Sequence, residues 1–244
     1  MDNQRFIEAI KKTESDLNKS GGIGTLGEKT LHAVLKNYFE PNINNQEIKV
    51  GSKYADIVND NGIIEVQTKQ FNKLRKKLET FLPKYKVTLV YPIAFMKFIY
   101  WVDEDTGEIT KGRKSPKNGQ ANDAFLELYK IKNFLKDENL KICIVLLHID
   151  EYRSLNGWSK DRKKGSHCKD RIPFKIEKEI MINSICDYSS LIPKNIPEVF
   201  SSKDYSLGAK IKRSTAQTAL NILNYLDIVE RVGKKGNSIL YKIK

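Results

Sequence analysis

Two acidic side chains and one amide alternate along a stretch of the chain that has the features of a β-hairpin. Asn59-Asp60-Asn61-Gly62 is a strong turn signal, and the flanking residues 54–58 and 63–67 are rich in β-branched side chains. A turn centred on Asp60-Asn61 sets Asp56 directly opposite Glu65, whereas a turn centred on Asn61-Gly62 shifts the partners by two residues. Both turns give the same two faces, because side chains alternate along a strand. One face carries Asp56, Glu65 and Gln67, and the other, expected in the core, carries Ile57, Ile64 and Val66.

The chemistry open to this face follows from the repulsion between its two acids. Carboxylates at facing or diagonal positions of adjacent strands lie about 4.5–8 Å apart. A cation between Asp56 and Glu65 removes the repulsion, and Mg²⁺ or Mn²⁺ binds such oxygens together with water and substrate phosphate. The metal ion then polarises a phosphodiester and lowers the pKa of the attacking water. The alternative is that both acids stand on the solvated face of an exposed hairpin.

A third acid precedes the hairpin. Glu28 lies seven residues, nearly two turns, before Leu35 in a helix expected at 25–38, so it points where the apolar side chains point. A glutamate aimed inward near a helix start needs a partner, which a shared cation would supply. The alternative is a capping box, in which Glu28 returns to the backbone of Thr25.

The order of the predicted elements adds to this pattern. After the helix at 25–38 come strands at 47–50, 54–58 and 63–67, a helix at 70–82 and a strand at 87–91. Over residues 25–91 this order and the placement of the acids resemble the PD-(D/E)xK nuclease superfamily. The resemblance implies an α/β fold with a restriction-endonuclease-like core, built as an α-β-β-β-α-β mixed sheet. It also implies metal-dependent phosphodiester cleavage, with Glu28, Asp56 and Glu65 as metal-binding residues.

The chain departs from the family pattern at one position. Gln67 stands where the family has a lysine, and a glutamine can position water but cannot neutralise charge. Lys69, two residues further along the same face, is a candidate for the missing charge, and the alternative is that it is merely solvated. The substitution leaves two functions open: an active nuclease, or a nuclease fold that binds DNA without cutting it.

The final part of the chain differs in character. Pro193 and Pro197 bracket the change, and we predict domains at 1–190 and 191–244. The remaining elements expected in the first domain are strands 95–102 and 108–111 in a hairpin, a helix near 121–135, a strand at 141–149 and a loop at 155–171.

Residues 200–243 resemble a winged helix-turn-helix. The pattern predicts helices at 201–208 and 213–226, followed by strands at 228–232 and 238–243 joined by a basic loop at 233–237. A recognition helix presents its exposed residues to base edges in the major groove, and a wing reaches adjacent phosphates. The helix candidates are Arg213, Ser214, Thr215, Gln217, Thr218 and Asn221, and those of the wing are Lys234 and Lys235. The alternative is a winged helix used for protein contact or as a spacer.

The composition agrees with a polyanion partner. Lys and Arg number 43 against 30 Asp and Glu, a formal net charge of +13, although a Lys-rich surface can also reflect genome composition. Basic runs at 111–117 and 160–171 are candidate clamps on a DNA backbone, with Trp158 as a candidate base-stacking residue or a half-buried one. The clamp residues singled out are Arg113, Lys114 and Lys117.

The sequence excludes other classes of protein. The three cysteines and three histidines lack the spacing of a zinc site, and no apolar run has the length of a membrane helix. We therefore expect a soluble, cytoplasmic protein that does not enter a membrane.

These observations predict a Mg²⁺- or Mn²⁺-dependent DNA endonuclease directed to DNA by a winged helix. The rival is a catalytically silent nuclease-fold DNA-binding regulator, and cleavage of RNA is a third hypothesis. Cutting both strands of a duplex generally needs two active sites, so a homodimer is a candidate assembly.

Overall fold

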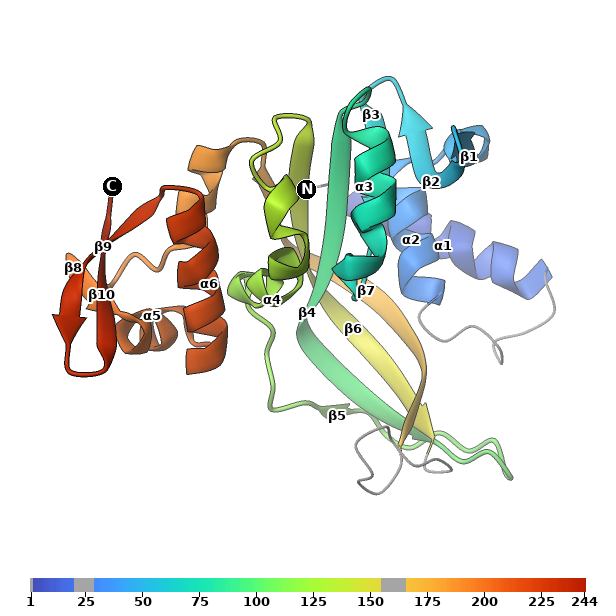
Figure 1. The fold of residues 1–244 in the computed structure, drawn as a ribbon. Coiled ribbons are helices and arrows are strands. Elements are labelled where there is room, and N and C mark those ends of the chain that lie inside the picture. Colours follow the sequence, from blue (N-terminus) through green and yellow to red (C-terminus); the bar gives the residue numbers. More distant parts are fainter. Residues whose placement is uncertain (1, 20–28, 155–165) are drawn as a thin grey trace. The chain divides into compact units, whose positions relative to one another are not determined.

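The chain has a mixed α/β fold, seen in a computed structural model that describes residues 2–19, 29–154 and 166–244 (Figure 1). Its first half contains α1 (Asn3–Lys19), α2 (Lys29–Phe39), β1 (Gln46–Val50), β2 (Lys53–Asn59), β3 (Gly62–Val66), α3 (Arg75–Phe81), β4 (Val87–Val102) and β5 (Arg113–Lys114). Its second half contains α4 (Phe125–Leu128), β6 (Leu140–Ser154), β7 (His167–Ile182), β8 (Val199–Ser201), α5 (Ser202–Ala209), α6 (Arg213–Tyr225), β9 (Val229–Lys235) and β10 (Ser238–Ile243). Short 3₁₀ segments are η1 (Ile43–Asn45), η2 (Phe71–Leu74), η3 (Ala121–Ala124), η4 (Tyr129–Phe134) and η5 (Ile185–Leu191).

The larger sheet is mixed, as expected from the sequence. Its strands follow the order β1-β2-β3-β4-β6-β7, and β5 pairs with β4. β2 and β3 are antiparallel, whereas β3 and β4 are parallel because α3 crosses between them. The order α2, β1, β2, β3, α3, β4 is the one expected from the sequence.

The contacts of the chain divide it into two compact units. Unit 1 comprises residues 1–46, 94–119 and 145–179, and unit 2 comprises residues 47–93, 120–144 and 180–244. The division passes through β4, β6 and β7, each of which contributes residues to both units. The boundary expected at 190/191 stays a prediction.

The register between β2 and β3 is that of the first of the two turns considered above. Ile57 pairs with Ile64, Val58 with Ile63 and Asn59 with Gly62, which leaves Asp60-Asn61 as the turn. Gly62 has a φ of +110°, and a Cβ there would lie 2.3 Å from the carbonyl oxygen of Lys86. No other residue fits without moving the backbone, so Gly62 helps to fix the register.

The helices that flank this hairpin bury the stripes expected of them. On α2, Leu31, Val34, Leu35 and Tyr38 are buried. Across η2 and α3, Phe71, Leu74, Leu78 and Phe81 are buried. Spacing of three or four residues puts each set on one face of its helix. The buried face of α3 packs within unit 2, to which α3, β2 and β3 all belong.

Three expectations differ from the structure. The strands expected at 87–91 and 95–102 are one 16-residue strand, β4. The expected hairpin with 108–111 is reduced to one antiparallel bridge between Val102 and Ile109, and β5 continues the pairing with β4. The helix expected at 121–135 is divided into η3, α4 and η4, and Ile131 within η4 has non-helical dihedral angles. The loop expected at 155–171 is a strand from His167 onward; Trp158 lies outside the described residues.

The C-terminal elements follow the predicted order. α5 begins at a capping box formed by Ser201 and Asp204, and Lys210 ends it in the left-handed region. α6 follows, and β9 and β10 form a hairpin to which β8 adds, giving a sheet of order β8-β10-β9. The residues expected to face inward from α6 are all buried: Ala216, Ala219, Leu220, Leu223 and Leu226.

Tyr205 of α5 connects this region to the rest of unit 2. Its fully buried hydroxyl donates to Asn122 Oδ1 (2.6 Å) and to the carbonyl of Leu191 (3.2 Å). We expect Tyr205→Phe to lower the free energy of unfolding by about 1–3 kcal/mol, because Asn122 Oδ1 loses its donor in a buried site, whereas the Leu191 carbonyl still accepts from Asn122 Nδ2. Urea denaturation measures the effect, and Tyr129→Phe, which alters a half-exposed ring, is the matched control. Equal stability of the two variants would contradict this role.

Candidate functional site

Asp56 of β2 and Glu65 of β3 lie next to each other and are buried, with 9% and 2% of their surfaces exposed. The backbone amide of Val66 donates to Asp56 Oδ2 (2.8 Å), and the amide of Asp56 donates to Glu65 Oε1 (3.3 Å). Each carboxylate thus accepts from the backbone of the other strand. The prediction that the two acids share a face is confirmed, and the alternative of a solvated hairpin face is wrong.

The hydrophobic side of the hairpin is less one-sided than expected. Ile57 and Val66 are buried as predicted, but Ile64 is only half-buried. Ile63, on the same face as Glu65, is almost completely buried. Both faces of β3 are therefore covered, which explains why Glu65 has so little contact with solvent.

Lys77 completes the cluster, and the sequence analysis missed it. Its Nζ lies 2.7 Å from Glu65 Oε2, and its side chain is 28% exposed. Lys77 follows Leu74 by three residues and precedes Phe81 by four, so it flanks the buried stripe of η2 and α3. That spacing was the available signal, since a lysine beside an apolar stripe can reach the sheet that the stripe covers.

Burial and the neighbouring charge of Asp56 raise the pKa of Glu65 to about 7, although Lys77 acts in the opposite direction. The single ammonium group therefore does not offset the desolvation and the repulsion. Near neutral pH, Glu65 is poised between its acid and its carboxylate. A further cation in contact with it would favour the carboxylate.

The other predicted catalytic residues lie less centrally. Gln67 directly follows β3, is half-buried, and its amide nitrogen donates to the carbonyl of Lys69. The Lys69 side chain is exposed, and its expected role as the missing charge stays a prediction. Glu28 lies outside the described residues, so its convergence with Asp56 and Glu65 also stays a prediction.

The donor set suits a hard divalent cation. Across residues 2–19, 29–154 and 166–244, no group of three or more His, Cys, Asp or Glu side chains could hold a metal ion. Asp56 and Glu65 nevertheless supply two carboxylates, and Mg²⁺ is commonly held by one or two carboxylates completed by water and substrate phosphate. The pair therefore fits such an ion by its chemistry.

The predicted recognition helix, α6, keeps only part of its expected polar face open. Arg213, Ser214 and Gln217 are exposed, and Thr218 is half-buried. Thr215, expected to be exposed, is buried, and α6 contacts other helical segments as well as β9. The exposed candidates are those in its first two turns.

The end of α6 is engaged within the chain. Lys132 Nζ of η4 donates to Asn221 Oδ1 (2.8 Å) and lies 4.5 Å from the ring centroid of Tyr225. Lys136 Nζ lies 4.7 Å from the same centroid. Asn221 is therefore committed to an internal contact in this structure.

The wing candidates Lys234 and Lys235 are exposed at the end of β9. The expected loop at 233–237 is shorter than predicted, since Lys235 pairs with Ser238 and leaves the two-residue turn Gly236-Asn237. Gly236 has a φ of +58°, which suits this tight turn. The hairpin thus carries both lysines at its tip.

The clamp candidates of the basic run at 111–117 are all exposed. Arg113 and Lys114 form β5, where Arg113 pairs with Ile99 and Lys114 with Phe98. Adjacent residues of a strand point to opposite faces, so Arg113 and Lys114 do not serve the same surface. Lys117 follows the strand and is exposed.

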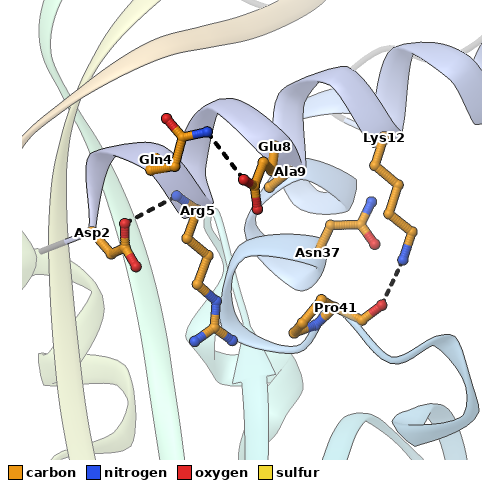
Figure 2. Close-up of a pocket in the computed structure, with 8 residues that line it drawn as sticks. All are labelled: Asp2, Gln4, Arg5, Glu8, Ala9, Lys12, Asn37 and Pro41. Atoms are coloured by element: carbon orange, nitrogen blue, oxygen red, sulfur yellow. Dashed lines mark hydrogen bonds between the residues drawn. The ribbon is translucent and has the colours of Figure 1, made fainter.

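A polar groove of about 540 Å³ lies between α1 and the C-terminal end of α2 (Figure 2). Its charged groups contact the protein: Arg5 donates to the carbonyl of Phe39 (2.9 Å) and Lys12 to that of Pro41 (2.7 Å). Cations at the last carbonyls of a helix are stabilised by the helix dipole. These contacts join α1 to the end of α2, so the cations of the groove have a structural role.

No helix in the described part of the chain is long and apolar enough to cross a membrane.

Comparisons with known proteins place the α/β region in a family. The profile of the family described as "Domain of unknown function (DUF8091)" matches residues 29–183. An "Uncharacterized protein" of Treponema pallidum (strain Nichols) is 28% identical over 222 residues, covering 90% of this chain and 87% of the relative. No solved structure matches. The Treponema match is long enough to extend beyond residue 183 into the C-terminal elements.

The raised pKa of Glu65 predicts a pH-dependent stability. Unfolding lowers the pKa from about 7 to about 4.5, so the folded protein binds the extra proton between these values. The stability from this group is complete below pH 4.5 and is lost as the pH rises towards 7. We expect the melting temperature of Glu65→Gln, relative to the wild type in EDTA, to increase between about pH 5 and about pH 7.5. Glu79→Gln, which alters an exposed glutamate of α3, should parallel the wild type; the same behaviour of Glu65→Gln would contradict the interpretation.

Proposed function

Because the chain belongs to the DUF8091 family, a domain of unknown function, we propose its function from its own residues: it is a metal-dependent DNA endonuclease that hydrolyses phosphodiester bonds. The observation that carries the proposal is the buried pair of carboxylates, Asp56 and Glu65, held together by β2 and β3. Mg²⁺ or Mn²⁺ is the proposed cofactor.

The energetics of the pair favour a role in chemistry. Two adjacent buried acids destabilise a fold unless a cation or a proton compensates them, and the pKa of Glu65 is raised despite Lys77. Strongly perturbed groups of this kind are concentrated at functional sites. A divalent cation held by Asp56 and Glu65 would remove this penalty.

Each residue of the cluster has a proposed task. Asp56 and Glu65 would hold the metal ion, which when bound polarises the scissile phosphodiester and lowers the pKa of the attacking water. Lys77, anchored on Glu65 Oε2, would place a positive charge beside the phosphate. Gln67, with an amide that can donate and accept, would orient a water molecule.

The resemblance to the PD-(D/E)xK superfamily supports the same proposal. The acids stand on consecutive antiparallel strands between α2 and α3, in the element order expected. Gln67 replaces the family's lysine, and Lys77 is our candidate for the missing ammonium, since it reaches Glu65 from α3. Lys69 is the second candidate for that charge.

DNA contact is proposed for the C-terminal elements as a winged helix-turn-helix. The helix pair α5 and α6, the turn between them and the β9–β10 hairpin support this proposal. The exposed side chains Arg213, Ser214 and Gln217 are suited to base edges, and Lys234 and Lys235 to phosphates. Thr215 is no longer a candidate, because it is buried.

One observation favours a second candidate function, a DNA-binding regulator with a silent nuclease fold. The ammonium group of Lys77 already occupies Glu65 Oε2, where a metal ion would bind. If that ion pair replaces the metal, the chain binds DNA and does not cut it. The two functions differ in whether Mg²⁺ or Mn²⁺ produces cleavage.

We expect Asp56→Asn and Glu65→Gln each to lower metal-dependent cleavage by about 100-fold or more, because each removes a metal ligand. Plasmid, single-stranded DNA and RNA are incubated with the full chain and Mg²⁺ or Mn²⁺, and products are quantified on gels. The matched control is Asp60→Asn, which changes an exposed acid in the turn of the same hairpin. A wild type as inert as the two variants, with DNA binding retained, would establish the regulator instead; cleavage of RNA alone would establish a ribonuclease.

The wing predicts a salt effect. We expect Lys234→Ala combined with Lys235→Ala to weaken binding across DNA sequences and to reduce the slope of log K against log salt by about 1 per lysine. Fluorescence anisotropy with a labelled duplex in EDTA measures both quantities. The control, Lys84→Ala combined with Lys194→Ala, removes two exposed lysines of the same unit. Equal slopes for the two double variants would exclude the wing from DNA contact.

A further inference from the structure

Unit 1 contains a second buried carboxylate, in an environment opposite to that of Glu65. Glu151 of β6 has no exposed surface, and three cationic side chains of β4, β6 and β7 contact it. Lys97 Nζ lies 3.2 Å from Oε2, Arg171 Nε lies 3.0 Å from Oε2, and Arg153 Nε lies 2.6 Å from Oε1. All four residues belong to the part of these strands that lies in unit 1.

Three cationic groups keep Glu151 ionised. Burial alone would raise the pKa of Glu151, but Lys97, Arg171 and Arg153 lower it, and the net shift is downward. Glu151 is thus a stable carboxylate on which three cationic side chains converge. Because cations held close together generate a positive potential, a surface of this kind attracts an anion.

The three cations remain open to solvent. Lys97, Arg153 and Arg171 are 22%, 28% and 29% exposed, whereas Glu151 beneath them is covered. Arg153 is also restrained by its Nη1, which donates to Ser166 Oγ (3.1 Å). A buried carboxylate that anchors cationic groups from below orients them before an anion arrives, which reduces the entropy lost on binding.

β5 extends the same face by a fourth cation. Arg113 pairs with Ile99, and Ile99 lies two residues beyond Lys97 on β4, so all three share one face. Arg113 is exposed. Lys114, its neighbour, pairs with Phe98 and points to the opposite face.

We propose that this surface, formed by Lys97, Arg113, Arg153 and Arg171 over Glu151, binds the phosphodiester backbone of DNA. Arginine and lysine donors recognise phosphate oxygens without reading sequence. The proposal rests on the proposed function for its substrate class, and it adds a contact in unit 1, distinct from the C-terminal module of unit 2.

The test uses the full chain in EDTA, which prevents metal-dependent cleavage, with a labelled DNA duplex and fluorescence anisotropy over a range of salt concentrations. Arg113→Met and Lys97→Met should each reduce the slope of log K against log salt by about 0.9 and weaken binding several-fold. Lys11→Met, which removes the charge of an exposed lysine on α1 of the same unit, should leave the slope unchanged.

Melting curves identify any variant that does not fold. If Lys97→Met fails to fold, Arg113→Met still tests the proposal, because the Arg113 side chain is exposed. The proposal is overturned if Arg113→Met behaves like Lys11→Met, or if inorganic phosphate at equal ionic strength displaces DNA from this surface as well as unlabelled duplex does. A wild type that does not cut DNA but shows the Arg113 effect would refute the nuclease while this surface stands. Cleavage by the wild type without an effect of Arg113→Met on DNA binding would support the nuclease and refute this surface.

Discussion

The register of the β2–β3 hairpin is the constraint on which the candidate site depends. A shift of one residue would turn Asp56 and Glu65 to opposite faces of the sheet and separate their carboxylates. The turn at Asp60-Asn61 and the close approach of Gly62 to the Lys86 carbonyl oppose such a shift. The cross-strand bonds from the Val66 and Asp56 amides then hold the acids in contact, so an unfavourable charge pair is maintained by favourable backbone geometry.

Local patterns were enough to predict the elements around the hairpin. Alternation along 54–67 gave the shared face of the acids, and the spacing of three or four residues gave the buried stripes of α2 and α3. The position of Lys77 could not be derived this way, because its contact depends on how α3 lies across the sheet. β7 was missed for a related reason: its charged residues, such as Arg171, meet partners on other strands that are distant in sequence. The burial of Thr215 likewise depends on tertiary packing, which the local pattern of α6 does not show.

The two buried glutamates show how differently one fold can treat the same side chain. Glu65 has a single lysine and an acidic neighbour, and its pKa is raised. Glu151 has three cations, and its pKa is lowered. The first environment lacks positive charge, whereas the second gathers three cationic side chains at one place, so a cation suits the first and an anion suits the second.

The attachment of α6 has a consequence for how the chain would use DNA. Contacts with η3, α4 and η4, together with the Tyr205 hydrogen bonds, fix the C-terminal helices to the unit that also contains β2 and β3. A recognition domain joined by a flexible linker would let cleavage occur at variable distances from the recognised sequence. In the proposed nuclease, the distance between the recognition helix and the Asp56–Glu65 pair would be constant, because both belong to one compact unit.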